Sequence, residues 1–229
     1  MAIVTTEHDG GHGRESGHGE GHHDTPQQRD GKERLALWLF IAGDAVIVAL
    51  LIFTWIYTRA LNTNGMWRGA ACTVANPCTD GLGNPLTHEV PKADPWYSVG
   101  IAALAVVAAL VFWNAERSAR DRAGRSAIAG QASLGVLVLL VAIGVQCYQF
   151  TALPFTTIVG TYASSFEFFM GSTLAHLLVL AFIGFGMWNR ARAGRYDDGR
   201  WYQVRLIRFF AVWIALSICL LTFVMSVFA

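Results

Sequence analysis

Three ionisable side chains lie inside strongly apolar stretches of the sequence, namely Asp44, Glu167 and His176. An ionisable group within hydrocarbon costs at least about 2.5 kcal/mol on insertion scales, so such groups usually face protein and can mark a functional site. Gln146 and Gln149 are uncharged polar companions in another apolar stretch. We therefore expect all five side chains to face the interior of the protein rather than lipid.

Asp44 and His176 fall at similar depths within their stretches, about 15 to 20 Å from one end at about 1.5 Å per residue. The two side chains could therefore pair directly. Such a pair is either a proton-linked or lipid-linked site or a set of hydrogen bonds that holds helices together, and the second interpretation is favoured. Glu167, Gln146 and Gln149 fall towards the other end, where a second polar layer is expected, although snorkelling explains Glu167 more simply.

The segments that carry these residues are long and apolar. The chain of 229 residues is 54% hydrophobic and 14% charged, which leaves too little polar surface for a soluble globule. About 20 helical residues cross about 30 Å of hydrocarbon, so each stretch can span a bilayer. We predict an all-α membrane protein, a bundle of five transmembrane helices in a membrane domain of residues 34–229. The helices are expected at residues 35–60, 96–114, 131–153, 161–188 and 206–228.

Aromatic side chains lie near the ends of several of these stretches, among them Trp38, Trp55, Trp96 and Trp188. Amphipathic rings favour the headgroup layer of a membrane. This pattern supports the predicted boundaries and places Trp55 among the residues expected at the membrane surface.

Arginine is concentrated in the connection after the second stretch and in the connection after the fourth. Because positively charged loops are retained in the cytoplasm during insertion, both connections are predicted to be cytoplasmic. The N-terminus is then cytoplasmic and the C-terminus extracytoplasmic, with the connections 61–95 and 154–160 outside. The arginines concerned are Arg117, Arg120, Arg122 and Arg125 in the first connection and Arg190, Arg192, Arg195, Arg200 and Arg205 in the second.

Residues 1–33 are rich in glycine, histidine and acidic side chains and are predicted to form a disordered cytoplasmic tail. The tail has no apolar run of the kind that a cleavable signal peptide needs, so the first apolar stretch is expected to remain as a spanning helix. The tail imidazoles could bind a transition metal, but their loose spacing favours a solvated tail. These histidines are His8, His12, His18, His22 and His23.

Cys72 and Cys78 lie in the long connection 61–95, which is predicted to be extracytoplasmic. In an oxidising compartment two cysteines at this spacing can close a small loop, so a disulfide is the favoured interpretation. A metal pair is the alternative, with His88 as the single nearby nitrogen ligand. Cys147 and Cys219 lie within apolar stretches and are expected to pack as small hydrophobic residues.

The sequence lacks the motifs of several classes of enzyme. Outside the tail there are two histidines, His88 and His176, which cannot supply the axial ligands of two haems and a copper site. The sequence has no P-loop, no Rossmann fingerprint and no nucleophile motif. We therefore assign no catalytic residue, metal site or bound cofactor to this chain. Small residues such as Ala105 and Ala109 could allow another helix to approach closely, which fits assembly into a complex.

These residues together resemble subunit III of the haem-copper oxidases, in its five-helix form. The first stretch, LALWLFIAGDAVIVALLIFTWIY, is similar to the opening span of that family, and Asp44 lies where the membrane carboxylate belongs. The third stretch ends GVQCYQF, in which Gln146 and Phe150 match and Gln149 replaces the expected glutamate. In the fourth, YASSFEFFMGSTLAHLL, Thr173 takes the place of the first of two family histidines. The matching residues there are Tyr162, Ser165, Phe166, Gly171 and His176.

The fifth stretch departs most from the family pattern, because it keeps Trp213 but lacks the usual histidine and aspartate. The resemblance extends over residues 34–228, and a histidine-rich tail is also similar to quinol oxidase members. The departures suggest a divergent branch.

The resemblance implies a noncatalytic subunit of a respiratory haem-copper oxidase, working in aerobic electron transport. Such a subunit binds the catalytic subunit I and other oxidase subunits, holds phospholipid in a cleft, and supports assembly, proton uptake and oxygen access. Haem and copper are then expected in the partner subunit, no nucleic acid is expected as a partner, and the location is the inner or plasma membrane. The alternatives are an accessory subunit III-like protein of a nitric oxide reductase and an independent small membrane transporter.

Overall fold

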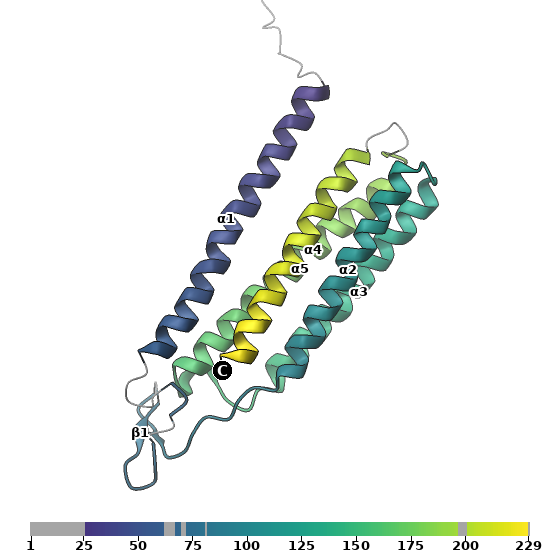
Figure 1. The fold of residues 1–229 in the computed structure, drawn as a ribbon. Helices are drawn as coiled ribbons and strands as arrows, with labels where there is room; N and C mark the ends of the chain where they lie inside the picture. The colour runs from purple at the N-terminus through teal and green to yellow at the C-terminus, as the bar shows by residue number, and fades with distance from the viewer. Residues whose placement is uncertain (1–25, 62–66, 70–71, 81, 197–200, 229) are drawn as a thin grey trace, which may run out of the picture.

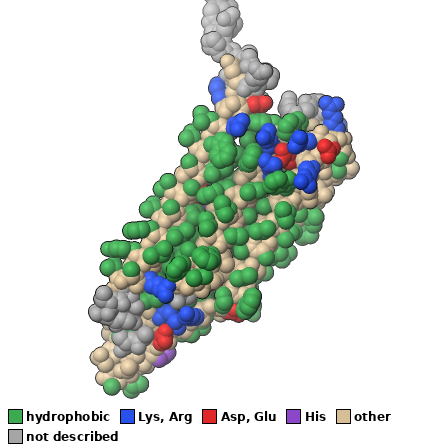
Figure 2. Space-filling view, in the orientation of Figure 1, with side chains coloured by type: hydrophobic (Ala, Val, Ile, Leu, Met, Phe, Trp, Pro, Cys, Tyr) green, Lys and Arg blue, Asp and Glu red, His purple; other side chains and the backbone are tan. Residues whose placement is uncertain are grey.

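The computed structural model describes residues 26–61, 67–69, 72–80, 82–196 and 201–228. Within these ranges the chain forms five long helices, each long and apolar enough to cross a membrane (Figure 1). Apolar side chains form a broad band between the two ends, where lysine and arginine gather (Figure 2). The prediction of a five-helix membrane protein is confirmed to this extent. The helices are α1 Pro26–Ala60, α2 Pro95–Arg120, α3 Arg125–Thr151, α4 Thr161–Arg192 and α5 Trp201–Val227.

Helices α2 to α5 form a tight bundle, in which α2 packs against α3 and α5, and α3 packs against α4. Helix α1 lies to one side, mainly against α5 and with a smaller contact to α4 (Figure 1). Only 17% of the residues in the most apolar segment of α1 are buried, compared with 56% in the corresponding segment of α5. Most of the surface of α1 therefore faces the surroundings of the protein.

All five helices extend beyond the predicted stretches at the same end of the bundle, where most of the arginines lie. Helix α1 begins at Pro26, so the prediction that residues 1–33 form a disordered tail is wrong for residues 26–33, while residues 1–25 lie outside the described part. Helix α2 ends at Arg120, α4 ends at Arg192, and α3 and α5 begin at Arg125 and Trp201. Arginine, lysine and glutamate favour helix, so the charged ends continue the apolar spans instead of forming loops.

The interior of the bundle contains a close approach of three helices around Phe112 of α2. A Cβ atom added to Gly135 of α3 or to Gly184 of α4 would lie 2.9 Å from the Phe112 Cζ atom, so a larger residue at either position would force the buried Phe112 ring to shift. Ala105 and Ala109 of α2 are also buried within the chain. The small residues expected to admit a partner helix therefore serve contacts between the protein's own helices.

At the opposite end, an aromatic cluster joins the last turns of α1 to the first turns of α4 and to the connection 61–95. Trp55 is fully buried there, and its ring centre lies 5.0 Å from that of Phe169 and 5.2 Å from that of Trp67. Trp55 therefore packs inside the protein and anchors α1 to the bundle. The backbone N–H of Ala93 donates a hydrogen bond to the Tyr162 hydroxyl, which fixes the end of the connection.

The connection 61–95 contains a small antiparallel hairpin, β1 Cys78–Thr79 and β2 Pro85–Leu86. A disulfide joins Cys72 to Cys78 with a Cα–Cα distance of 5.3 Å, as the sequence predicted. Asp80 turns the hairpin by accepting hydrogen bonds from the backbone N–H groups of Leu82 and Asn84 and from the Asn84 side chain. The Asn84 side-chain bond is the main reason that the pKa of Asp80 is lowered.

Candidate functional site: a carboxylate, an imidazole and an indole between three helices

His176 of α4 and Trp213 of α5 both lie within hydrogen-bonding distance of Asp44 of α1. The His176 Nε2 atom lies 3.1 and 3.0 Å from the two carboxylate oxygens of Asp44. The Trp213 indole N–H donates to Asp44 Oδ2 at 2.6 Å. The side chains of His176 and Asp44 are only 10% and 15% exposed. The direct pairing expected from their similar depth in the membrane is present.

The hydrogen bonds limit which atoms of this cluster can carry a proton. His176 Nδ1 is 2.7 Å from the backbone carbonyl oxygen of Ser172, and because a carbonyl only accepts, Nδ1 carries a proton. A hydrogen bond between His176 Nε2 and Asp44 then requires one further proton, held either on the imidazole or on the carboxyl group. The indole N–H of Trp213 is a second donor to the same carboxylate and bonds to its Oδ2 atom. The contact between His176 Nε2 and Asp44 is therefore a hydrogen bond only when one such proton is present.

The helical pattern of α1 explains why Asp44 faces the bundle. Its buried residues Ile41, Val48, Leu51 and Trp55 recur at intervals of three, four and seven residues, and Asp44 lies on this stripe. On α4, Ser172 lies one turn before His176 and its carbonyl oxygen fixes the ring orientation. The residues that position the cluster are thus ordinary helical neighbours of its members.

The cluster borders a groove between α1, α4 and α5 with a volume of about 100 Å³. Apolar side chains make up most of its wall, so a hydrocarbon chain or a neighbouring helix can lie against it while Asp44 and His176 supply a polar spot. The lining residues are Phe40, Asp44, Ala175, His176, Val179, Phe210 and Ile214.

The two glutamines form a separate buried layer inside the bundle. The Gln146 side-chain amide donates to Gln149 Oε1 at 3.2 Å, and the Gln149 amide donates to the Ser98 hydroxyl of α2 at 2.9 Å. Thr222 of α5 donates to the Ser98 carbonyl oxygen at 3.4 Å. Thr173 of α4 is buried beside this layer, and its hydroxyl has no hydrogen-bond partner among the described residues. The expected second polar layer is present for Gln146 and Gln149, where it connects α2, α3 and α5, but Glu167 bonds to Thr157 instead.

Glu167 makes a different contact. Its carboxylate accepts a hydrogen bond from the hydroxyl of Thr157, in the short 3₁₀ helix η1, Thr157–Val159, that precedes α4. The side chain is half-buried near the end of the bundle, which agrees with the simpler interpretation of a carboxylate close to the membrane surface.

A second buried ion pair was missed by the sequence reasoning. Glu116 of α2 is only 3% exposed, and one of its carboxylate oxygens lies 2.8 Å from Arg208 Nη1 of α5. The Arg208 guanidinium also lies over the rings of Trp113 and Phe209, at 4.7 and 4.2 Å. Arg208 falls inside the predicted stretch 206–228. A charged side chain within an apolar stretch usually faces protein, so this position could have indicated a buried partner.

The other residues singled out from the sequence lie outside the Asp44 cluster. Phe166 belongs to the aromatic cluster, whereas Gly171 has open space on its Cβ side and Ser165 is half-buried. Cys219 is half-buried as a small apolar residue, but the expectation that Cys147 is packed is wrong, since it lies on the exposed face of α3. Within the described ranges no group of three or more His, Cys, Asp or Glu side chains could hold a metal ion. The tail histidines lie outside those ranges.

The helices and the cluster define a multi-pass helical membrane protein with a carboxylate–imidazole pair inside its membrane-spanning part. No protein-family model matches the chain, and no curated protein matches it either.

Proposed function

We propose that this protein is a noncatalytic subunit of a respiratory haem-copper oxidase complex, similar to subunit III of that family. The observation that carries the proposal is the meeting of Asp44, His176 and Trp213 at one groove. All three are residues on which the resemblance rests, and they come from the first, fourth and fifth helices. Their contact brings the carboxylate, the imidazole and the indole of the resemblance into one cluster, which supports the proposal.

The proposed partners are a haem-bearing catalytic subunit, other oxidase subunits and membrane phospholipid. Helix α1 supports this, because it presents a long row of exposed aliphatic and aromatic side chains to its surroundings. Lipid or an apolar face of another subunit can cover such a surface within a membrane. The exposed residues of α1 include Leu35, Leu39, Phe40, Val46, Ile47, Leu50 and Phe53. Haem and copper belong to the partner in this proposal.

The role proposed for the cluster is to assist proton uptake by the complex. A proton shared by Asp44 and His176 can be passed on with little movement, because both acceptors already lie about 3 Å apart. Phospholipid in the adjoining groove would keep bulk water away from the pair. Oxygen, which is apolar, could enter along the same apolar wall.

The proposed orientation places the arginine-rich end in the cytoplasm and the disulfide-bonded connection 61–95 outside, in the inner or plasma membrane. Arginines on the ends of α2, α3, α4 and α5 gather at one end, in agreement with retention of positive charge in the cytoplasm (Figure 2). The Cys72–Cys78 disulfide at the other end fits an oxidising compartment.

The proposal is tested by purifying the tagged full chain from native membranes in a mild detergent. We expect a haem absorbance spectrum of an oxygen-reducing enzyme in the same fraction, with a catalytic subunit identified by mass spectrometry. A haem spectrum together with nitric oxide reduction would favour the nitric oxide reductase alternative. A colourless homogeneous protein would contradict the proposal and favour an independent transporter.

The same preparation tests the role of the cluster through Asp44→Asn, which keeps an oxygen acceptor for Trp213 but removes the charge. The complex should assemble with an unchanged spectrum and take up protons severalfold more slowly during turnover. Glu167→Gln is the matched control, because it removes a carboxylate outside the cluster, and it should have little effect. If both variants have the same turnover and the same rate of proton uptake, Asp44 does not assist proton uptake and has only a structural role.

A further inference from the structure

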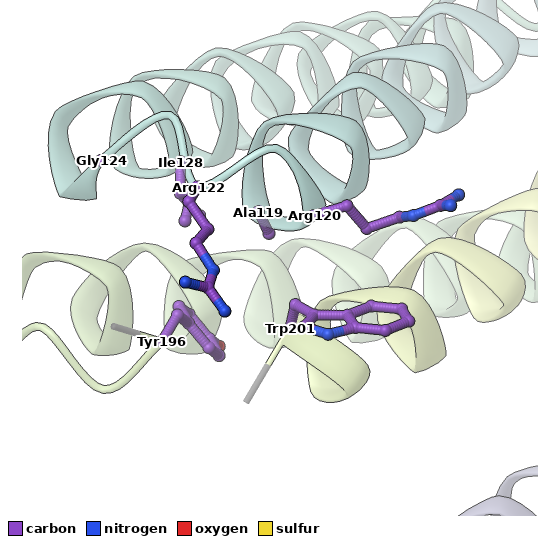
Figure 3. Close-up of a pocket in the computed structure, with 7 residues that line it drawn as sticks. All are labelled: Ala119, Arg120, Arg122, Gly124, Ile128, Tyr196 and Trp201. Carbon is purple, nitrogen blue, oxygen red and sulfur yellow. The ribbon is translucent and has the colours of Figure 1, made fainter. Parts of the chain in front are cut away.

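A second pocket, remote from the Asp44 groove, lies at the arginine-rich end between the α2–α3 turn and the α4–α5 region (Figure 3). Its volume is about 180 Å³. A water molecule occupies about 30 Å³ of liquid, so the pocket has room for a group of several heavy atoms. The lining residues are Ala119, Arg120, Arg122, Gly124, Ile128, Tyr196 and Trp201.

Two guanidinium groups give this pocket a positive charge. Figure 3 shows Arg122 extending from the α2–α3 turn towards Tyr196, and Arg120 extending above Trp201. The Arg120 Cζ atom lies 5.9 Å from the centre of a Trp201 ring. Arg122 has a φ of +52°, a left-handed conformation that is unfavourable for a non-glycine residue. Strained backbone of this kind persists where the surrounding structure holds it, often at binding sites.

Tyr196 lies at the wall of the pocket and carries an unused donor that is buried beneath the pocket surface. The side chain is 5% exposed, and its hydroxyl has no hydrogen-bond partner among the described residues. A buried hydroxyl without a partner is unfavourable, so a ligand that reaches it and accepts a hydrogen bond from it would be stabilised. Burial raises the pKa of Tyr196, against a smaller opposing effect of Arg190. The hydroxyl therefore remains a neutral donor at physiological pH.

The N-terminus of α3 lies next to the same pocket, which Gly124 and Ile128 line. Helix α3 follows Gly124, which has a φ of +90° and provides no side-chain cap for the helix. The first N–H groups of a helix lack partners within the helix and carry a partial positive charge. Anionic oxygen atoms are the ligands that such an end binds most readily.

We propose that this pocket binds a phosphate group, as part of an anionic phospholipid headgroup or of a soluble phosphate ester. Arg122 and Arg120 supply the positive charge, and the Tyr196 hydroxyl donates one hydrogen bond. Planar guanidinium groups match phosphate oxygens in geometry and make charge-assisted hydrogen bonds to them. Glu116, the buried carboxylate nearest along α2, is already paired with Arg208. The proposal does not depend on the oxidase assignment.

The test uses the full chain, freed of lipid, in a maltoside detergent that contains no phosphate. Inorganic phosphate and dihexanoyl phosphatidylglycerol are the two probes, and their affinities are measured from the shift in thermal unfolding at constant ionic strength. Arg122→Gln should weaken binding about tenfold and Tyr196→Phe about fivefold. Arg192→Gln is the matched control at the same end of the bundle and should change the affinity less than twofold.

Saturable binding of phosphatidylglycerol alone would identify a lipid headgroup, and binding of inorganic phosphate as well would identify a site open to soluble esters. Both results support the proposal. It is overturned if neither probe binds saturably, or if Arg192→Gln weakens binding as much as Arg122→Gln. Tyr196→Phe removes a single hydroxyl, so it decides the question if the arginine variant does not fold.

Discussion

Replacing Glu116 by alanine is expected to lower the free energy of unfolding by about 3 kcal/mol, because it leaves a buried guanidinium without its carboxylate. Arg208 is 14% exposed, and its Nε atom already has no hydrogen-bond partner among the described residues. Arginine cannot release its proton, so the uncompensated charge would remain. Unfolding can be followed by tryptophan fluorescence in mixed maltoside and dodecyl sulfate micelles.

An exposed pair in the same chain provides the control. Arg68 and Glu89 are 3.0 Å apart, but Glu89 is 48% exposed, so Glu89→Ala should lower the stability by less than about 1 kcal/mol. The double variant Glu116→Leu with Arg208→Met removes both charges and should regain most of the lost stability. Equal losses for Glu116→Ala and Glu89→Ala would contradict the view that burial makes the first pair important.

Replacing Asp44 by alanine is expected to lower the free energy of unfolding by about 2 kcal/mol. The change removes the acceptor of the Trp213 indole N–H and the partner of His176 Nε2. The expected loss is smaller than that for Glu116→Ala, because an imidazole left alone can release its proton whereas a guanidinium cannot. The same unfolding assay in mixed micelles measures it.

A double-mutant cycle with His176→Ala isolates the interaction between the two side chains. We expect a coupling energy of about 1 kcal/mol, within the range found for hydrogen bonds between membrane helices. A coupling energy near zero would mean that the 3.0 Å contact contributes nothing to stability. Asp44→Asn, which keeps an acceptor for Trp213, should lose less stability than Asp44→Ala.

Much of this architecture could be predicted because a membrane restricts the possible structures so strongly. Apolar length alone fixed the number of spans, since backbone groups within lipid must be satisfied inside each helix. Equal depth along two helices was enough to suggest the pair Asp44 and His176, because helices that cross the same bilayer share one depth scale. The disulfide followed from two cysteines close together in a connection.

Other features could not be predicted, because they depend on which faces of the helices meet. Trp55 has the type and position of an interfacial residue, and only the packing of α1 against α4 buries it. Glu116 lies just beyond the predicted stretch 96–114, so nothing in the sequence indicated that it would be buried against Arg208. The hydroxyl of Tyr196 lies in a turn between two helices, where sequence patterns carry no information about burial.

The threading of the chain through the membrane is the claim on which the proposed role of the cluster depends, and lysine labelling tests it most directly. The sequence has two lysines, Lys32 and Lys92, on opposite sides of the first span, and both are exposed. An amine-reactive reagent that cannot cross membranes, applied to intact cells, should modify Lys92 and spare Lys32, as read by peptide mass spectrometry. Both should react after permeabilisation. Modification of Lys32 with protection of Lys92 in intact cells would contradict the account.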